Sequence, residues 1–209
     1  QKLVDAAEQI RATAAPGAEV RHIAADVTVE DQVVAAVAAA CGPAGTLDIL
    51  IANAGGSLHM GPFETADEVG VRATIDLNLM GTLNVTHACL QGMVQRRWGR
   101  IVTIMSDAGR IGEARYVVYG AAKAALTQLT RIWSAEIAGT GVSIVAVDPG
   151  EMATRMHRDA VPEADPASLA QPVACAERLV AWLEAATPEE LAEPIVRSLQ
   201  ALPSVEVAS

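Results

Sequence analysis

The sequence predicts an α/β protein built on a doubly wound parallel sheet, and three features carry this prediction. Helical and strand-like segments alternate in steady rotation over residues 1–147. The strand-like segments are apolar throughout, as parallel strands covered on both faces must be. Since helix-joined parallel strands cross over right-handedly, the helices are expected on both sides of the sheet. The chain of 209 residues is 51% hydrophobic but only 3% aromatic, so Ala, Val, Leu and Ile must build the core.

The first half of the chain is expected to contain two helices and two strands before its longest helix. Residues 1–14 carry apolar positions at helical spacing. Residues 18–27 are expected to form a strand that runs into a loop. Thr28 is the expected N-cap of a helix that ends near the "CGPAG" segment. The run "LDILIA", residues 47–52, has the length of a buried strand.

The alternation continues with a long helix whose opening "TADE" has the capping-box form at residue 65. This helix is expected to run to about Arg97. The segments "RIVTIM" (100–105) and "GVSIVAV" (141–147) are expected to be strands, and the segment 115–138 between them a helix.

The composition changes after Pro149. Residues 160–172, "AVPEADPASLAQP", are expected to be irregular, with two short helices after them. The second opens with "TPEE", in which Thr187 is the cap and Glu190 closes the capping box. No repeat or second domain is visible, so residues 1–209 are expected to form one domain.

Bulk properties exclude several kinds of protein. A net charge of -10 repels phosphate backbones, so no nucleic-acid partner is expected. The three cysteines form no CxxC, and the four histidines no helical pair, so neither a disulfide framework nor a metal site is expected. The longest apolar run, residues 33–41, is too short to span a bilayer. Reduced cysteines in a cytoplasmic protein without membrane contact are the expectation.

Small or polar residues follow each expected strand. They are Asp26 after the first, "NAGG" with Asn53 after the second, Ser106 after the third, and Asp148 within "DPGEMAT" after the fourth. Loops are often rich in such residues, but four in register are unlike ordinary loops. Ligands of doubly wound folds bind outside the carboxyl ends of the strands, so we expect a site at this edge.

Tyr119 and Lys123 belong to the same edge and carry chemistry. With two tyrosines and two lysines in the chain, a Tyr-x-x-x-Lys spacing arises by chance in about 2% of such chains. The i, i+4 spacing places both side chains on one helix face. An ammonium about 4 Å from a phenol contributes roughly 4 kcal/mol at an effective dielectric of about 20, which favours a lowered phenol pKa. The alternative is an exposed Lys beside a core Tyr.

These motifs resemble the short-chain dehydrogenase/reductase family over residues 1 to about 155. The matching segments, in order and at the family's spacings, are "IANAG", Asn78 in "LNLMGT", Ser106, "YGAAK", and Pro149–Gly150 with Thr154. The resemblance implies a Rossmann-like fold and an NAD(P)-dependent oxidoreductase. Such an enzyme moves hydride between nicotinamide and a small-molecule carbonyl or secondary alcohol.

The resemblance also implies a role for each residue. Tyr119 would exchange the proton, Lys123 would lower its pKa and hold ribose hydroxyls, Ser106 would bond the substrate oxygen, and Asn78 would hold a relay water. The implied cofactor-binding residues are Asp26, Val27, Asn53, Ala54, Gly55, Tyr119, Lys123, Pro149, Gly150, Met152 and Thr154. The implied division is a core over 1–155, a substrate lid over 156–172 and C-terminal helices over 173–209. Homodimers or homotetramers are expected through the helices near 66–97 and 116–138.

One family feature is missing. No strand with a Gly-rich pyrophosphate loop precedes the helix at residue 1, and "GTGVS" at 139–143 lies between a helix and a strand, the wrong context. The interpretation is that the N-terminal βαβ unit is truncated. The choice between NADP and NAD lies in that unit and stays open. A non-catalytic nucleotide-binding or scaffolding relative is the alternative function, whereas a serine hydrolase is excluded because Ser106 lies in "IMSDAG" rather than G-x-S-x-G.

Overall fold

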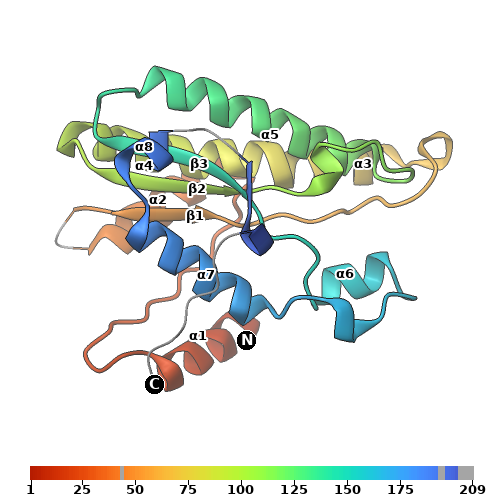
Figure 1. Ribbon diagram of the computed structural model, residues 1–209, viewed down its shortest axis with the longest axis horizontal. Helices are drawn as coiled ribbons and strands as arrows, with labels where there is room; N and C mark the ends of the chain where they lie inside the picture. Colours follow the sequence, from red (N-terminus) through yellow and green to blue (C-terminus); the bar gives the residue numbers. More distant parts are fainter. Residues whose placement is uncertain (43–44, 193–195, 202–209) are drawn as a thin grey trace.

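A four-stranded, all-parallel sheet forms the centre of the protein (Figure 1). The structure, a computed structural model, describes residues 1–42, 45–192 and 196–201. The strands lie in sequence order and are β1 (Ile49–Ala52), β2 (Gly99–Ile104), β3 (Val142–Asp148) and β4 (Val196–Ser198). Three of these strands, β1 to β3, confirm the predicted ones. The parallel α/β class is therefore correct.

Helices cover both faces of the sheet, as the doubly wound prediction requires. In Figure 1, α4 (Gly81–Arg96) and α5 (Val117–Glu136) lie on one face and α7 (Pro172–Ala185) on the other. Neighbouring strand residues point to opposite faces. Ile101 therefore packs in one core cluster with Met93 of α4, while Val102 packs in another with Leu179 of α7.

Two further predicted helices are present in the first half of the chain. They are α1 (Lys2–Thr13) and α2 (Glu30–Cys41). Thr28, however, does not cap α2, because its N–H and hydroxyl both donate to the carboxylate of Asp26. The residue at the cap position is Val29, which makes no side-chain capping bond.

The predicted strand at residues 18–27 is wrong. This segment is extended but joins no sheet, since no strand of the described residues lies beside it to complete a ladder. Side chains satisfy some of its backbone groups instead. Arg11 donates to the carbonyl of Val20 at 2.9 Å, and Asn84 of α4 donates to the carbonyl of Val27 at 2.9 Å.

The long predicted helix is present but interrupted. It consists of α3 (Glu68–Ile75), a π-helical turn η3 (Asp76–Met80) and α4. Its cap is Asp67, whose carboxylate accepts from Gly70 N at 2.7 Å; the predicted cap, Thr65, lies in the preceding 3-10 turn η2 (Phe63–Thr65). A carboxylate at Asp67 begins the helix two residues later than expected because it reaches the free N–H groups of the first turn.

The C-terminal region is more ordered than the sequence suggested. It contains α6 (Arg155–Ala160), the short turn η5 (Pro166–Ser168), α7, and α8 (Pro188–Ala192). The predicted capping box is confirmed: Thr187 Oγ1 accepts from Glu190 N, and Glu190 Oε2 accepts from Thr187 N. Strand β4 and the turn η6 (Leu199–Ala201) were not predicted, and residues 202–209 of the expected C-terminal helices lie outside the described residues.

Candidate active site

The residues that follow three of the strands meet in one cavity at the carboxyl edge of the sheet. This cavity of about 270 Å³ is lined by Asn53 after β1, Ser106 after β2, and Asp148 at the end of β3. The structure thus brings together three of the residues from which the sequence predicted a site at this edge. Asp26 does not join them, because residues 18–27 are not part of the sheet.

Tyr119 and Lys123 of α5 line the same cavity, and both are buried. The turn η4 (Asp107–Gly109), which directly follows Ser106, presses against the start of α5. Two glycines allow this approach. A Cβ on Gly120 would lie 2.6 Å from the carbonyl oxygen of Ala108, and a Cβ on Gly109 would lie 2.9 Å from the backbone of Lys123. Small residues on both sides of the contact thus bring Ser106 beside the tyrosine.

The pKa of Tyr119 is raised, which is opposite to the direction expected from the sequence. Burial of the phenol is the largest cause, and the negative charges of Asp107 and Asp148 add to it. A hydrogen bond with Ser106 acts the other way by favouring the phenolate. The lowered pKa expected for Tyr119 is therefore not found in the protein by itself, because burial of the phenol is the largest cause of the shift.

Burial also changes the pKa of Lys123. Only 5% of the residue is exposed, and burial lowers its pKa from 10.5 to about 8. Its Nζ donates to the carbonyl of Ile104 at 2.8 Å and lies 5.6 Å from the centre of the Tyr119 ring. The ammonium therefore stands next to the phenol, as the i, i+4 spacing predicts.

Asn78 lies in the π-helical turn and is fully buried, and it is not one of the residues that line the cavity. Its side chain binds Gly56 twice: Nδ2 donates to the carbonyl at 2.6 Å and Oδ1 accepts from the N–H at 3.1 Å. Nδ2 also donates to the carbonyl of Thr74. Asn78 thus fixes the loop after β1 to the helix by hydrogen bonds. A π-helical turn inside an α-helix is often found at functional sites.

The expected cofactor-binding residues divide between two cavities. Gly55, Pro149, Gly150, Met152 and Thr154 line the main one. Val27 and Ala54 line a second cavity of about 120 Å³, and Asn53 lines both. Asp26 lines neither in the described structure; its carboxylate binds Thr28.

The segment after β3 leaves the site and returns to it. Backbone bonds join Ala153 N to the carbonyl of Ala170 and Ala170 N to the carbonyl of Glu151. Between these bonds, Thr154 caps α6 by accepting from His157 N at 3.1 Å, and His157 lines the cavity. The first part of the expected lid thus borders the site.

Several cavity residues were missed from the sequence. Tyr116 lines the cavity and stacks obliquely on Tyr119 with ring centres 6.3 Å apart. Its position three residues before Tyr119, on the same helix face, could have revealed it. Glu151 and His157, which approach each other at 3.4 Å, also line the cavity, and nothing in their spacing distinguishes them from ordinary loop residues.

The residues present fit the nicotinamide end of a dinucleotide. The cavity is lined by the buried ammonium of Lys123 and by hydroxyls that include those of Ser106 and Tyr119. A Cβ on Gly55 would fall 2.8 Å from Asn78 Oδ1, so only glycine leaves that wall open. Such a group, when bound, supplies a hydride. The protein supplies proton donors and acceptors within the same space.

No cluster of three His, Cys, Asp or Glu side chains suited to a metal ion occurs among the described residues. Over the same residues, no helix has the length and apolarity needed to cross a membrane.

Comparison with known proteins agrees with this geometry. The family model described as short chain dehydrogenase matches residues 1–165. The chain is 34% identical to the inactive 2-(S)-hydroxypropyl-CoM dehydrogenase 2 of Xanthobacter autotrophicus, over 89% of this chain and 80% of that protein. It is 39% identical to the acetoacetyl-CoA reductase of Cupriavidus necator, over 54% of this chain and 45% of that one.

Among solved structures, the chain is similar to that of ElxO with NADP bound. The TM-score is 0.72 at 28% identity, and the superposition covers 83% of this chain and 74% of ElxO. The family match, the relatives and the shared architecture agree with the cavity that unites Ser106, Tyr119 and Lys123. The chain belongs to the short-chain dehydrogenase/reductase family of NAD(P)-dependent oxidoreductases.

Proposed function

We propose that Tyr119 is the general acid and base of an NAD(P)-dependent interconversion of a small-molecule carbonyl and a secondary alcohol. The observation that carries this proposal is the meeting of a phenol and an ammonium from α5 with a hydroxyl from the loop after β2 at one cavity. Ser106 comes from the end of β2, and Tyr119 and Lys123 come from α5.

In the reducing direction, the hydride for the carbonyl carbon would be supplied by a nicotinamide cofactor held at this cavity. Ser106 and Tyr119 hold the carbonyl oxygen by hydrogen bonds, and the O–H bond of Tyr119 breaks as its proton passes to that oxygen. In the oxidising direction the phenolate takes the proton back. Because the pKa of Tyr119 is raised, the tyrosine is protonated at neutral pH, so reduction is favoured there and alcohol oxidation at alkaline pH.

The remaining residues would bind the cofactor or a relay water. Val27, Asn53 and Ala54 would border the adenosine half, and Pro149 to Thr154 the nicotinamide amide. Lys123 would hold ribose hydroxyls, and Asn78 would order a water for proton relay. Residues 156–172 would close over the substrate as a lid within a single domain.

The competing function is a non-catalytic relative, and one similar protein carries the word inactive in its name. The cavity argues for catalysis. The buried ammonium of Lys123 lies beside a phenol and a hydroxyl that can exchange a proton, a combination that binding alone does not require.

The first test is a fluorescence titration with NADH and NADPH in parallel. Binding of one of them at micromolar concentration would identify the cofactor. Tyr119→Phe is then expected to keep that binding and lose about 10²–10⁴-fold in turnover of a ketone panel, since only proton transfer is removed. Lack of binding by the intact protein would favour the scaffolding role, and an active Tyr119→Phe would refute the assigned acid.

The assembly and location follow as further parts of the proposal. Exposed apolar side chains on α5, Val117 and Ile132, support packing of a second copy on the α4 and α5 face, giving a homodimer or homotetramer. Three free cysteines support a reducing, cytoplasmic compartment. Light scattering at several concentrations measures the assembly, and a monomer throughout would contradict it.

A further inference from the structure

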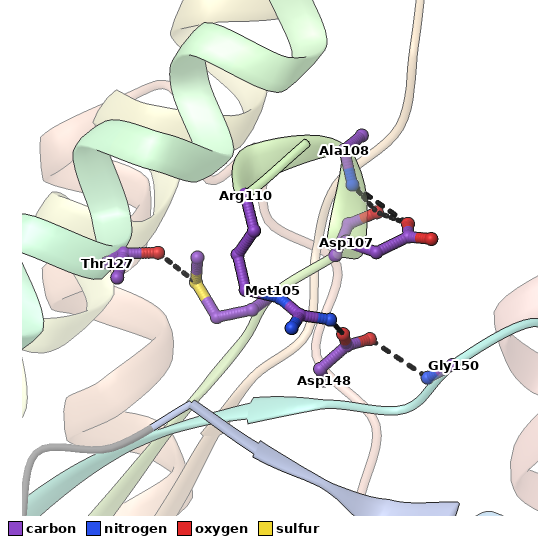
Figure 2. Close-up of polar contacts among 8 residues, drawn as sticks. Met105, Asp107, Ala108, Arg110, Thr127, Asp148 and Gly150 are labelled. Carbon is purple, nitrogen blue, oxygen red and sulfur yellow. Dashed lines mark hydrogen bonds and ion pairs between the residues drawn. The ribbon is translucent and has the colours of Figure 1, made fainter. Parts of the chain in front are cut away.

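An ion pair connects two segments that line the cavity (Figure 2). Arg110, just after η4, donates from Nη2 to Asp148 Oδ2 at 2.8 Å. The other oxygen of the carboxylate, Oδ1, accepts from Gly150 N at 2.9 Å. One carboxylate therefore connects the Ser106 loop with the Pro149–Gly150 loop.

This pair is unlike the others in the described part of the chain. The Asp148 side chain is 5% exposed, the lowest value in any ion pair there, whereas the Arg110 side chain is 52% exposed. A buried carboxylate needs a partner, because removing the partner leaves an uncompensated charge. Arg110 thus reaches in from the surface to neutralise a charge that lines the cavity.

The charges that face Tyr119 make this neutralisation relevant to proton transfer. Asp107 of η4 and Asp148 of β3 both raise the pKa of Tyr119, and Ser106 lowers it through a hydrogen bond. Tyr116, directly before α5, adds a weaker raising effect, and the ammonium of Lys123 on α5 lies 5.6 Å from the Tyr119 ring. Of the two carboxylates that raise the pKa of Tyr119, Asp148 is the one that forms an ion pair with an arginine.

We propose that Arg110 is a positioning residue, which offsets the charge of Asp148 at the proton-transfer tyrosine and fixes the two loops that carry Ser106 and Gly150. The proposal rests on the assigned role of Tyr119 but is tested without turnover. Arg110 touches neither reacting group; it acts through Asp148.

The test uses the fact that the whole chain has two tyrosines. In a Tyr116→Phe background, ultraviolet absorbance of tyrosinate against pH reports Tyr119 alone, with circular dichroism recorded at each pH to confirm folding. Arg110→Gln is expected to lower the tyrosinate-to-tyrosine ratio at a fixed pH by about two- to fivefold at low salt, because an unbalanced negative charge opposes ionisation. Asp148→Asn is expected to raise that ratio.

Three variants separate charge from shape. Arg110→Lys keeps the positive charge, so its tyrosinate-to-tyrosine ratio is expected to lie close to that of the parent. The double variant Arg110→Gln with Asp148→Asn has no unpaired buried charge, so it is expected to fold and to reverse the effect of Arg110→Gln. Arg72→Gln removes an arginine from an exposed pair with Glu68 on α3 and is expected to change nothing.

A merely structural brace would alter the melting temperature without moving the titration. An Arg110→Gln ratio equal to that of Arg72→Gln, or an Asp148→Asn ratio equal to the parent, would overturn the proposal. The melting temperature and the tyrosinate titration are both measured without cofactor or substrate. Failure here is therefore distinct from failure of the proposed reaction, which the turnover of Tyr119→Phe decides.

Discussion

Lys123 is the residue at which stability and chemistry conflict most directly. Its charge is nearly removed from water, and a single carbonyl, that of Ile104, accepts from it. An apolar side chain of similar length would avoid this desolvation. The protein keeps a lysine there, next to the phenol, at a cost to the folded state.

The sign of that cost follows from proton linkage. Burial lowers the pKa of Lys123 to about 8 in the folded state from 10.5. Below pH 8 both states hold the proton, and the folded state bears the buried charge. Between about pH 8 and 10.5 the folded state has released a proton that the unfolded chain still binds, so its stability rises with pH.

Lys123→Met is therefore expected to abolish turnover and yet to stabilise the fold at pH 7. Removing the buried charge is expected to raise the free energy of unfolding by on the order of 3 kcal/mol, and losing the hydrogen bond to Ile104 to lower it by about 1 kcal/mol. Urea unfolding at pH 7 and at pH 10 measures the difference, which should shrink at the higher pH.

The chain provides a matched control for this measurement. Lys2 is the other lysine, exposed on α1, and Lys2→Met should leave stability unchanged at both pH values. A Lys123→Met protein less stable than the parent at pH 7 would show that its hydrogen bond, and not its desolvation, dominates.

At the scale of elements, the contact between η4 and α5 sets the distance from Ser106 to Tyr119. Glycine is normally unfavourable inside a helix. Gly120 in α5 is retained where a Cβ would lie 2.6 Å from the carbonyl oxygen of Ala108. The helix loses intrinsic stability so that the turn after β2 can approach its first turns.

Gly120→Ala is expected to destabilise the protein by about 1–3 kcal/mol through overpacking, although alanine has the higher helix propensity. It should also lower turnover, since the Ser106 loop is pushed from Tyr119. Denaturant midpoints and turnover of the same preparation measure both effects.

Gly92 in α4 is the control, because a Cβ there meets only the flexible end of Arg96 at 3.6 Å. Gly92→Ala should stabilise by up to about 1 kcal/mol. If both substitutions raised stability equally, η4 would be able to move away from α5, and the contact at Gly120 would not determine the position of Ser106 relative to Tyr119.

At the scale of the whole molecule, the sheet couples its two helical layers. β3 is buried along its full length, and its side chains enter both core clusters, so α7 on one face and α4 on the other depend on one strand. We expect residues 1–209 to unfold as one cooperative unit, consistent with the predicted single domain.

Leu179→Ala tests this coupling. Leu179 on α7 is buried, and its truncation should lower the free energy of unfolding by about 2–4 kcal/mol. Its neighbour Val180 is 54% exposed, so Val180→Ala should change stability by less than about 0.5 kcal/mol. Circular dichroism and tryptophan fluorescence should give coincident urea transitions; separated transitions would indicate two independent units.

The sequence by itself determined the class of the fold and the membership of the site. Apolar strand patterns and the Tyr119–Lys123 spacing are local features, and the carboxyl ends of parallel strands must meet at one edge. The gathering of Asn53, Ser106 and Tyr119 at one cavity could therefore be expected without coordinates.

The tertiary structure alone decided which extended segments pair and how the site ionises. Residues 18–27 have the pattern of a strand but pair with no strand among the described residues, whereas Val196–Ser198 forms a strand beside β3. The raised pKa of Tyr119 and the Arg110–Asp148 pair depend on burial and on charges distant in sequence. Ladder pairing and desolvation are properties of the packed neighbourhood, which no local pattern encodes.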